Sequence, residues 1–112
     1  MNTFLALVSM FFFSVETPNN FSVETVIQAM ENEDFTFVEE ALTKGGLSPN
    51  ALYEGKSLLV HAVMLDKAEM VRLLIVKGAH LYLASEEGMI PMDYAIKYQK
   101  IHAQAELIVI TS

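Results

Sequence analysis

Apolar residues in the middle of the chain recur at the spacing of helices that each bury one side. Leu58, Leu59, Ala62 and Val63 follow an i, i+1, i+4, i+5 pattern, and residues 68–75 carry a second apolar stripe. The two stripes are separated by only a short stretch of chain. This pattern predicts two short helices that pack against each other.

Start and stop signals flank these stripes. Ser57 precedes the first one and can accept a hydrogen bond from a free amide of the first helical turn. Gly78 follows the second stripe, where a helix end favours a residue with left-handed backbone. Further along, Pro91 fits the first position of another helix, because its missing N–H is not needed there.

The chain repeats itself at one fixed offset. Gly55–Ala62 aligns with Gly88–Ala95 without a gap. The same offset relates the following pairs: Ala29 and Ala62, Val38 and Val71, Leu42 and Ile75, Lys44 and Lys77, Gly45 and Gly78, Leu74 and Leu107, Ile75 and Ile108. One helix pair cannot bury its own apolar face, so we expect neighbouring pairs to stack.

At these residues the chain resembles the ankyrin repeat, whose pattern is Gly-x-Thr-Pro-Leu-His-x-Ala, then Ile/Val-Val-x-x-Leu-Leu and a Lys-Gly-Ala-Asp turn. The middle unit matches at Gly55, Ser57, Leu59, Ala62, Met70, Val71, Leu73, Leu74, Lys77, Gly78 and Ala79, and the third at Gly88, Pro91, Met92 and Ala95. The resemblance implies an all-α stack of helix-turn-helix repeats with short loops and hairpin turns. Its units are 22–54, 55–87 and 88–112, of which the first and last are degenerate.

The chain departs from the family pattern at two kinds of position. Ile27, Val60 and Asp93 stand where the family has histidine, so its ladder of hydrogen bonds between repeats is missing. His80 replaces the aspartate of the turn. The last unit is modified as a terminal unit would be, because Gln104 replaces Val71 of the unit before it, and Ala105 replaces Arg72.

Residues 1–21 form a separate N-terminal segment, in which eleven of the first fifteen residues are apolar. The run 4–15 is shorter than the roughly 20 residues that a spanning helix needs, so we expect no integral membrane span. One interpretation is a capping helix, since the repeat offset aligns Phe4 with Phe37. The alternative is a signal peptide over residues 1–14, although no Lys or Arg precedes the run and no cleavage site with small residues follows it. A retained segment indicates a cytoplasmic protein, and a leader indicates a periplasmic or secreted one.

The charge of the chain is concentrated in its first half. Net charge is −7 over 112 residues, a length that fits a single domain. Residues 1–54 hold eight acidic residues and one lysine, whereas residues 55–112 hold six of each sign. Such an acidic chain does not suit nucleic acid, whose phosphates require Lys and Arg. It suits a partner protein with a basic surface.

The sequence shows no arrangement of residues that indicates catalysis. It lacks cysteine, which excludes disulfides, thiolate metal sites and cysteine nucleophiles. His61, His80 and His102 are too far apart along the chain for the spacing of a helical metal site. We expect His61 to pack in the core and the other two to be exposed. The prediction is therefore a protein without enzymatic activity, cofactor or metal.

What the resemblance implies is a module that binds another protein through its loop tips and the exposed side of the first helices. Carried over position by position, the predicted binding face consists of Phe21, Tyr53, Glu54, Lys56, Met64, Leu65, Glu86, Glu87, Met89, Lys97 and Tyr98. We expect its six apolar and aromatic members to be exposed, since such residues often dominate affinity.

A chain of this size would act as a small inhibitor or adaptor. A bacterial toxin-neutralising immunity protein is one concrete form of this function. An acidic protein would be complementary in charge to a basic toxin. One alternative is an exported ankyrin protein with residues 1–14 as its leader. Another is a structural protein that self-associates through the Phe-rich N-terminus, so both a monomer and a dimer remain open.

Overall fold

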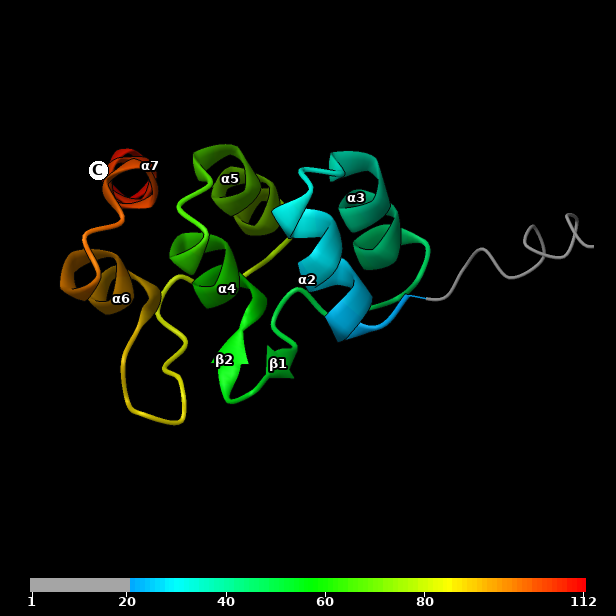
Figure 1. The fold of residues 1–112 in the computed structure, drawn as a ribbon, viewed down its shortest axis with the longest axis horizontal. Helices are drawn as coiled ribbons and strands as arrows, with labels where there is room; N and C mark the ends of the chain where they lie inside the picture. Colours follow the sequence, from blue (N-terminus) through cyan, green and yellow to red (C-terminus); the bar gives the residue numbers. More distant parts are fainter. Residues whose placement is uncertain (1–20) are drawn as a thin grey trace, which may run out of the picture.

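The computed structural model describes residues 21–112, and this part of the chain is mostly helical (Figure 1). Its elements are α2 (Val23–Glu31), α3 (Phe35–Thr43), β1 (Leu52–Tyr53), β2 (Lys56–Ser57), α4 (Leu58–Met64), α5 (Ala68–Val76), α6 (Pro91–Lys97) and α7 (Ile101–Thr111). None of these helices is long and apolar enough to cross a membrane. The predicted N-terminal capping helix or leader lies outside the described residues, except for Phe21.

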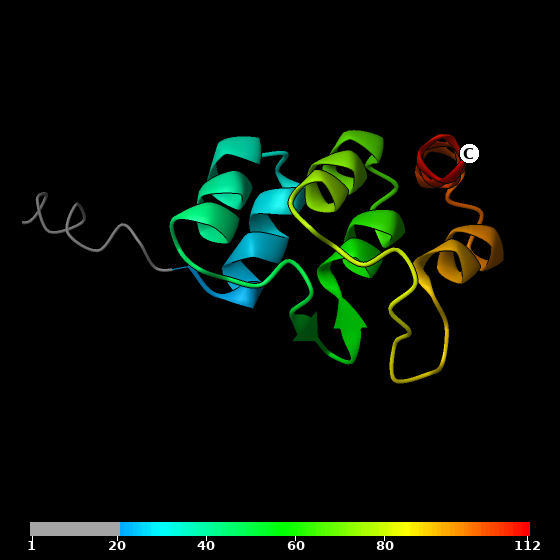
Figure 2. The ribbon, with the colours of Figure 1, turned by 180° about the vertical axis from the view of Figure 1, so that it is seen from behind.

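The helices form two rows. One row contains α2, α4 and α6 and the other contains α3, α5 and α7, as seen from both sides in Figures 1 and 2. Contacts join α2 to α4, α4 to α6, and α5 to α7. The first helix of each pair therefore packs on the first helix of the next, and α2 and α7 lie at opposite ends of the molecule.

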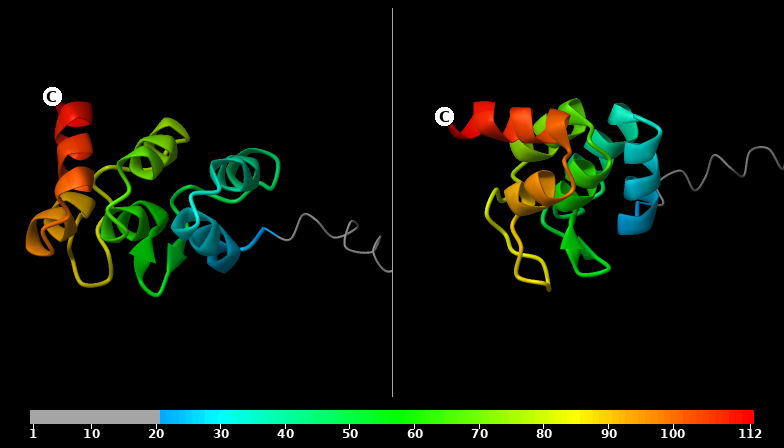
Figure 3. Two further views of the ribbon diagram at one scale, coloured as in Figure 1. Left: turned by 45° about the horizontal axis from the view of Figure 1, so that its top comes forward. Right: turned by 60° about the vertical axis from the view of Figure 1, so that its left-hand side comes forward.

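The mostly helical architecture includes two short strands, and hairpin turns were part of the expected fold. β1 and β2 pair in antiparallel register, with Leu52 opposite Ser57 and Tyr53 opposite Lys56. The turn between them is formed by Glu54 and Gly55, which both have positive φ. The β-hairpin and the loop before α6 project from the same side of the helical rows (Figure 3).

The helix boundaries follow from the predicted caps. The Ser57 hydroxyl accepts a hydrogen bond from the amide of Val60 (3.2 Å), and Pro91 occupies the first turn of α6. Asp93 accepts a hydrogen bond from the amide of Ile90 (2.9 Å) and thereby caps its own helix.

Backbone geometry recurs at the offset found in the sequence. Glu33, Asp66 and Gln99 occupy equivalent positions in the turns between paired helices, and their φ angles are 58°, 58° and 55°. The amide after each of them bonds back to a carbonyl near the end of the preceding helix: Asp34 to Ala29, Lys67 to Ala62, and Lys100 to Ala95. The three helix pairs are therefore joined internally by the same turn.

A continuous core runs through the helices. It is formed by Val26, Ala29, Met30, Val38, Ala41, Leu58, Leu59, Val60, Ala62, Val63, Met70, Val71, Leu74, Ala79, Tyr94, Ala95, Ala103 and Leu107. Apolar area removed from water contributes about 25 cal/mol per Å², so this shared core is the main source of stability. His61 lies at its edge and is only half-buried, unlike the prediction of a core histidine.

Polar contacts tie successive helix pairs together. Glu33 pairs with Lys67 (2.7 Å), Glu39 pairs with Lys77 (3.1 Å), and the guanidinium of Arg72 binds Glu106 through two hydrogen bonds of 2.9 Å each. Asp66 accepts a hydrogen bond from the amide of Ala103 at the start of α7 (2.9 Å). Asn50 accepts from the amide of His80 (2.8 Å) and donates to the carbonyl of Gly78 (3.3 Å).

Candidate protein-binding surface

The β-hairpin is held against α4 by His61. The Nε2 atom of His61 lies 2.9 Å from the carbonyl oxygen of Tyr53, and the centroids of the two rings are 5.8 Å apart. This contact explains why His61 stays at the edge of the core. It also fixes the direction of the hairpin, so that Glu54 is exposed at its tip.

The loop before α6 docks on the hairpin tip. The amide of Glu86 donates a hydrogen bond to the carbonyl of Gly55 (3.0 Å). A Cβ atom at Gly55 would lie 2.6 Å from Oε1 of Glu86, so the side chain of Glu86 lies directly over the turn. Glu54 and Glu86 are thus brought together although they are far apart in the sequence.

The loop itself is anchored by Ser85, which is 8% exposed. Its Oγ accepts hydrogen bonds from the amides of Glu87 (3.1 Å) and Met89 (3.4 Å) and lies 2.7 Å from the hydroxyl of Tyr94. The same Tyr94 hydroxyl lies 3.0 Å from Oε1 of Glu87. A buried tyrosine in α6 therefore positions the Glu87 carboxylate of this exposed loop.

Negative charge gathers around the ring of Tyr53. The carboxylate of Glu24, and after it that of Glu54, raises the pKa of the Tyr53 hydroxyl above its ordinary value of 10.0, because both disfavour a phenolate nearby; partial burial adds to this. We call Glu24, Tyr53, Glu54, Glu86 and Glu87 the acidic surface. All four of its carboxylates are exposed, and Lys56 on β2 is half-buried.

The structure divides the predicted binding face. Tyr53, Glu54, Lys56, Glu86 and Glu87 come together at the hairpin end of α4. The predicted residues Met64 and Leu65 lie at the other end of this helix, and Lys97 and Tyr98 lie at the corresponding end of α6. Seven helical residues span about 10 Å, so these are two separate areas.

Most of the apolar members of that face are less accessible than expected. Of the six, only Tyr98 is exposed (44%), with its ring stacked on that of Tyr94 and the ammonium of Lys97 5.3 Å from its centroid. Phe21 packs on Phe37, with ring centroids 5.2 Å apart. Tyr53 is half-buried in the hairpin, and three further members pack partly against the core: Met64, Leu65 and Met89.

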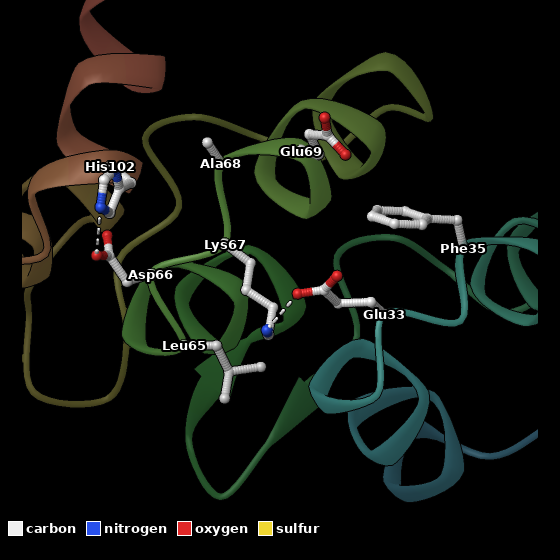
Figure 4. A pocket seen from close by; sticks show the side chains of 8 residues that line it. All are labelled: Glu33, Phe35, Leu65, Asp66, Lys67, Ala68, Glu69 and His102. Atoms are coloured by element: carbon white, nitrogen blue, oxygen red, sulfur yellow. Dashed lines mark hydrogen bonds and ion pairs between the residues drawn. The ribbon is translucent and has the colours of Figure 1, made fainter.

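A pocket that the sequence did not reveal lies at the opposite edge, along the turns between paired helices. It has a volume of about 370 Å³ and is lined by Glu33, Phe35, Leu65, Asp66, Lys67, Ala68, Glu69 and His102 (Figure 4). The only signal for this pocket in the sequence was the recurrence of an acidic residue, Glu33 and then Asp66, at the repeat offset. Its lining comes from three helix pairs, so the pocket depends on their stacking.

The charges in this pocket are largely satisfied by one another. Lys67 pairs with Glu33 at 2.7 Å, and Nε2 of His102 lies 4.0 Å from the carboxylate of Asp66. Asp66 also caps α7 through the amide of Ala103. Within residues 21–112, no group of three or more His, Asp or Glu side chains is arranged to hold a metal ion. The polar side chains of this pocket therefore serve to hold neighbouring helix pairs together.

Comparison of the chain with known protein families finds no match, and comparison with curated proteins finds no significant relative.

Proposed function

We propose that this protein is an ankyrin-type repeat protein that binds another protein and carries out no chemistry itself. The assignment is supported by the family motif in residues 55–79 and by the recurrence of the helix pairs and their left-handed turn residues at one fixed offset. The helical rows provide a rigid body, and the hairpin and loop are presented on one side of it. Such a body suits binding, because little order is lost when the partner docks.

The observation that carries the proposal is the joining of the hairpin tip to the loop before α6. The hydrogen bond from Glu86 to Gly55 brings the Glu86 side chain to the hairpin tip, where Glu54 is exposed, and Glu54 together with Glu24 acts on the ring of Tyr53. The exposed carboxylates of Glu24 and Glu54 beside this half-buried ring give the surface a negative potential. The complementary partner has a basic surface, and its association is accelerated by electrostatic steering.

As a small acidic protein that covers a basic surface, it acts as an inhibitor or adaptor. A toxin-neutralising immunity protein is the most concrete form of this proposal, because inhibition requires only that the partner's surface be occupied. Its mechanism is steric: the rigid body excludes other ligands from the covered surface. No proton transfer or covalent step is involved.

The test is affinity capture from lysate with the full chain and two charge-matched double variants. E54Q/E86Q removes two charges from the acidic surface, and E31Q/E69Q removes two exposed charges elsewhere. Once the partner is captured, its association rate constant is measured at low salt. We expect this rate constant to be about tenfold lower for the first variant and unchanged for the second. Equal losses in both variants would contradict a localised acidic interface.

A further inference from the structure

The pocket at the turns between paired helices has apolar walls that its ion pairs do not use. Phe35, Leu65 and Ala68 line it, and all three are half-buried, so part of each side chain is open to a bound molecule. Its volume of about 370 Å³ lies at the lower end of the range for small-molecule sites, roughly 300–1,000 Å³. The cavity therefore suits a small ligand with an apolar part.

The charges that line this pocket are negative in total. Glu33, Asp66 and Glu69 supply three carboxylates, and the opposing groups are the ammonium of Lys67 and the imidazole of His102. The sum is negative whether or not the imidazole carries a proton. A cation is therefore complementary to the pocket, whereas an anion is repelled.

Two of these carboxylates remain available to a ligand. Lys67 reaches Oε2 of Glu33, and the Glu33 side chain is still 59% exposed. Within the described part of the chain, the Glu69 side chain forms no hydrogen bond or ion pair. It attracts Arg72 electrostatically, but that guanidinium is already held by Glu106 through two hydrogen bonds. Glu69 is therefore not one of the groups that join helix pairs.

An aromatic ring lies beside the two available carboxylates. Figure 4 shows the ring of Phe35 and the carboxylates of Glu33 and Glu69 around the same opening, on the side of the pocket away from His102. A guanidinium group suits such a place, because its flat face stacks on an aromatic ring while its N–H groups donate to carboxylates. An ammonium ion would use the charges but not the flat face of the ring.

We propose that this pocket binds an aliphatic guanidinium compound. The guanidinium donates to Glu33 and Glu69 and stacks on Phe35, and the aliphatic chain lies along Leu65 and Ala68. The ligand thus contacts the first two helix pairs together. This site is independent of the acidic surface, which lies at the opposite end of α4.

Other ligands fit the pocket less well. A metal ion requires several converging ligands, and no group of three or more His, Asp or Glu side chains in residues 21–112 is arranged in that way. An anion could use Lys67 and the start of α5, which no side chain caps. It would, however, face three carboxylates. A neutral apolar molecule would leave these carboxylates without a new partner.

NMR titration of the full chain with butylguanidinium at constant ionic strength tests the proposal. We expect the amide signals of residues 33–36 and 65–69 to shift, with a Kd on the order of 1 mM, as suits a ligand of roughly eight non-hydrogen atoms. Pentanoate has a chain of similar length and the opposite charge, and guanidinium alone lacks the chain. Both should bind at least about tenfold more weakly.

Three variants separate the contributions to binding. Glu69→Gln should weaken butylguanidinium binding about fivefold, and Glu31→Gln, an exposed residue outside the pocket, should leave it unchanged. Lys67→Met removes the ammonium that competes for Glu33 and should tighten binding about threefold, which a structural role of Lys67 alone would not produce. Circular dichroism spectra check that each variant is folded.

Several results would overturn the proposal. Pentanoate binding as tightly as butylguanidinium would identify an anion site, and shifts confined to residues 52–57 and 84–88 would place the cation on the acidic surface. A folded Glu69→Gln that binds like the wild type, or a folded Lys67→Met that binds less tightly, would also contradict it. Capture of a protein partner through the acidic surface does not involve this pocket, so failure of either proposal leaves the other standing.

Discussion

The amide of Glu86 donates a hydrogen bond to the carbonyl of Gly55, and the Glu86 side chain covers the turn at Gly55. This relationship connects a hairpin in one helix pair to the loop that leads into the next. It also brings together two of the four carboxylates of the acidic surface, those of Glu54 and Glu86. The acidic surface therefore depends on the shape of a single turn.

Gly55→Ala tests this turn against Gly88→Ala. Gly55 and Gly88 have φ of 78° and 82°, so alanine is strained at both, and we expect each variant to lose about 1 kcal/mol in the free energy of unfolding. Only the Cβ atom at position 55 would meet another group, the mobile end of Glu86. The Glu86 amide resonance should therefore shift in Gly55→Ala even though the two positions are far apart in the sequence. Unchanged Glu86 signals would show that the two segments do not touch.

Ser85→Ala should lower the free energy of unfolding more than Tyr94→Phe does. Removing the Ser85 hydroxyl leaves two backbone amides and the Tyr94 hydroxyl without a shared partner. Leaving buried polar groups unpaired costs about 1–3 kcal/mol, whereas the loss of the Tyr94 hydroxyl should cost about 1 kcal/mol. Urea unfolding monitored by circular dichroism measures both values. The reverse order would contradict the anchoring role of Ser85.

The pKa of Tyr53 reports on the acidic surface directly. Glu24 is the largest cause of the raised pKa and Glu54 the second. Glu24→Gln should therefore lower the Tyr53 pKa more than Glu54→Gln does, and Glu31→Gln, at the far end of α2, should leave it unchanged. NMR titration of the ring carbons measures this for each tyrosine separately. If the Tyr53 pKa does not change in Glu24→Gln, Glu24 on α2 is not part of the acidic surface.

The Arg72–Glu106 pair should make stability depend on pH. Its hydrogen bonds lower the pKa of Glu106 below the ordinary value of 4.5, although partial burial opposes this. A lowered pKa stabilises the fold above 4.5, and this contribution is lost as the pH falls through the folded-state pKa. The difference in Tm between wild type and Glu106→Gln should be constant from pH 5 to 7 and shrink below pH 4.5.

The control for this pair is Glu31→Gln, an exposed glutamate at the end of α2. Its Tm difference from wild type should show no comparable decrease between pH 5 and 3. If Glu106→Gln behaves in the same way as this control, the pair between α5 and α7 does not contribute to stability.

The sequence predicted the helices well because their signals are local. The stripe at 58–63 and the N-cap at Ser57 depend only on neighbouring residues, as do the start of α6 at Pro91 and the turn at Gly78. The fixed repeat offset then indicated that the pairs are equivalent. These features required no knowledge of contacts between distant segments.

The surface was harder to predict because it depends on contacts between helix pairs. The hydrogen bond from Glu86 to Gly55 joins residues that are far apart in the sequence, and no pattern in either segment predicts it. Met64 and Leu65 were expected to be exposed from their place in the repeat. They lie at the end of a helix of only 7 residues, where both are half-buried against the core.

Hydrogen–deuterium exchange of the captured partner complex tests the central claim most directly. The account predicts that partner binding slows exchange at residues 52–57 and 84–88 together, since the two segments form one surface. It also predicts that exchange along α7 is unchanged by the partner. Protection confined to the turns that line the pocket, or to α7, would contradict the proposal that the protein binds its partner through the acidic surface.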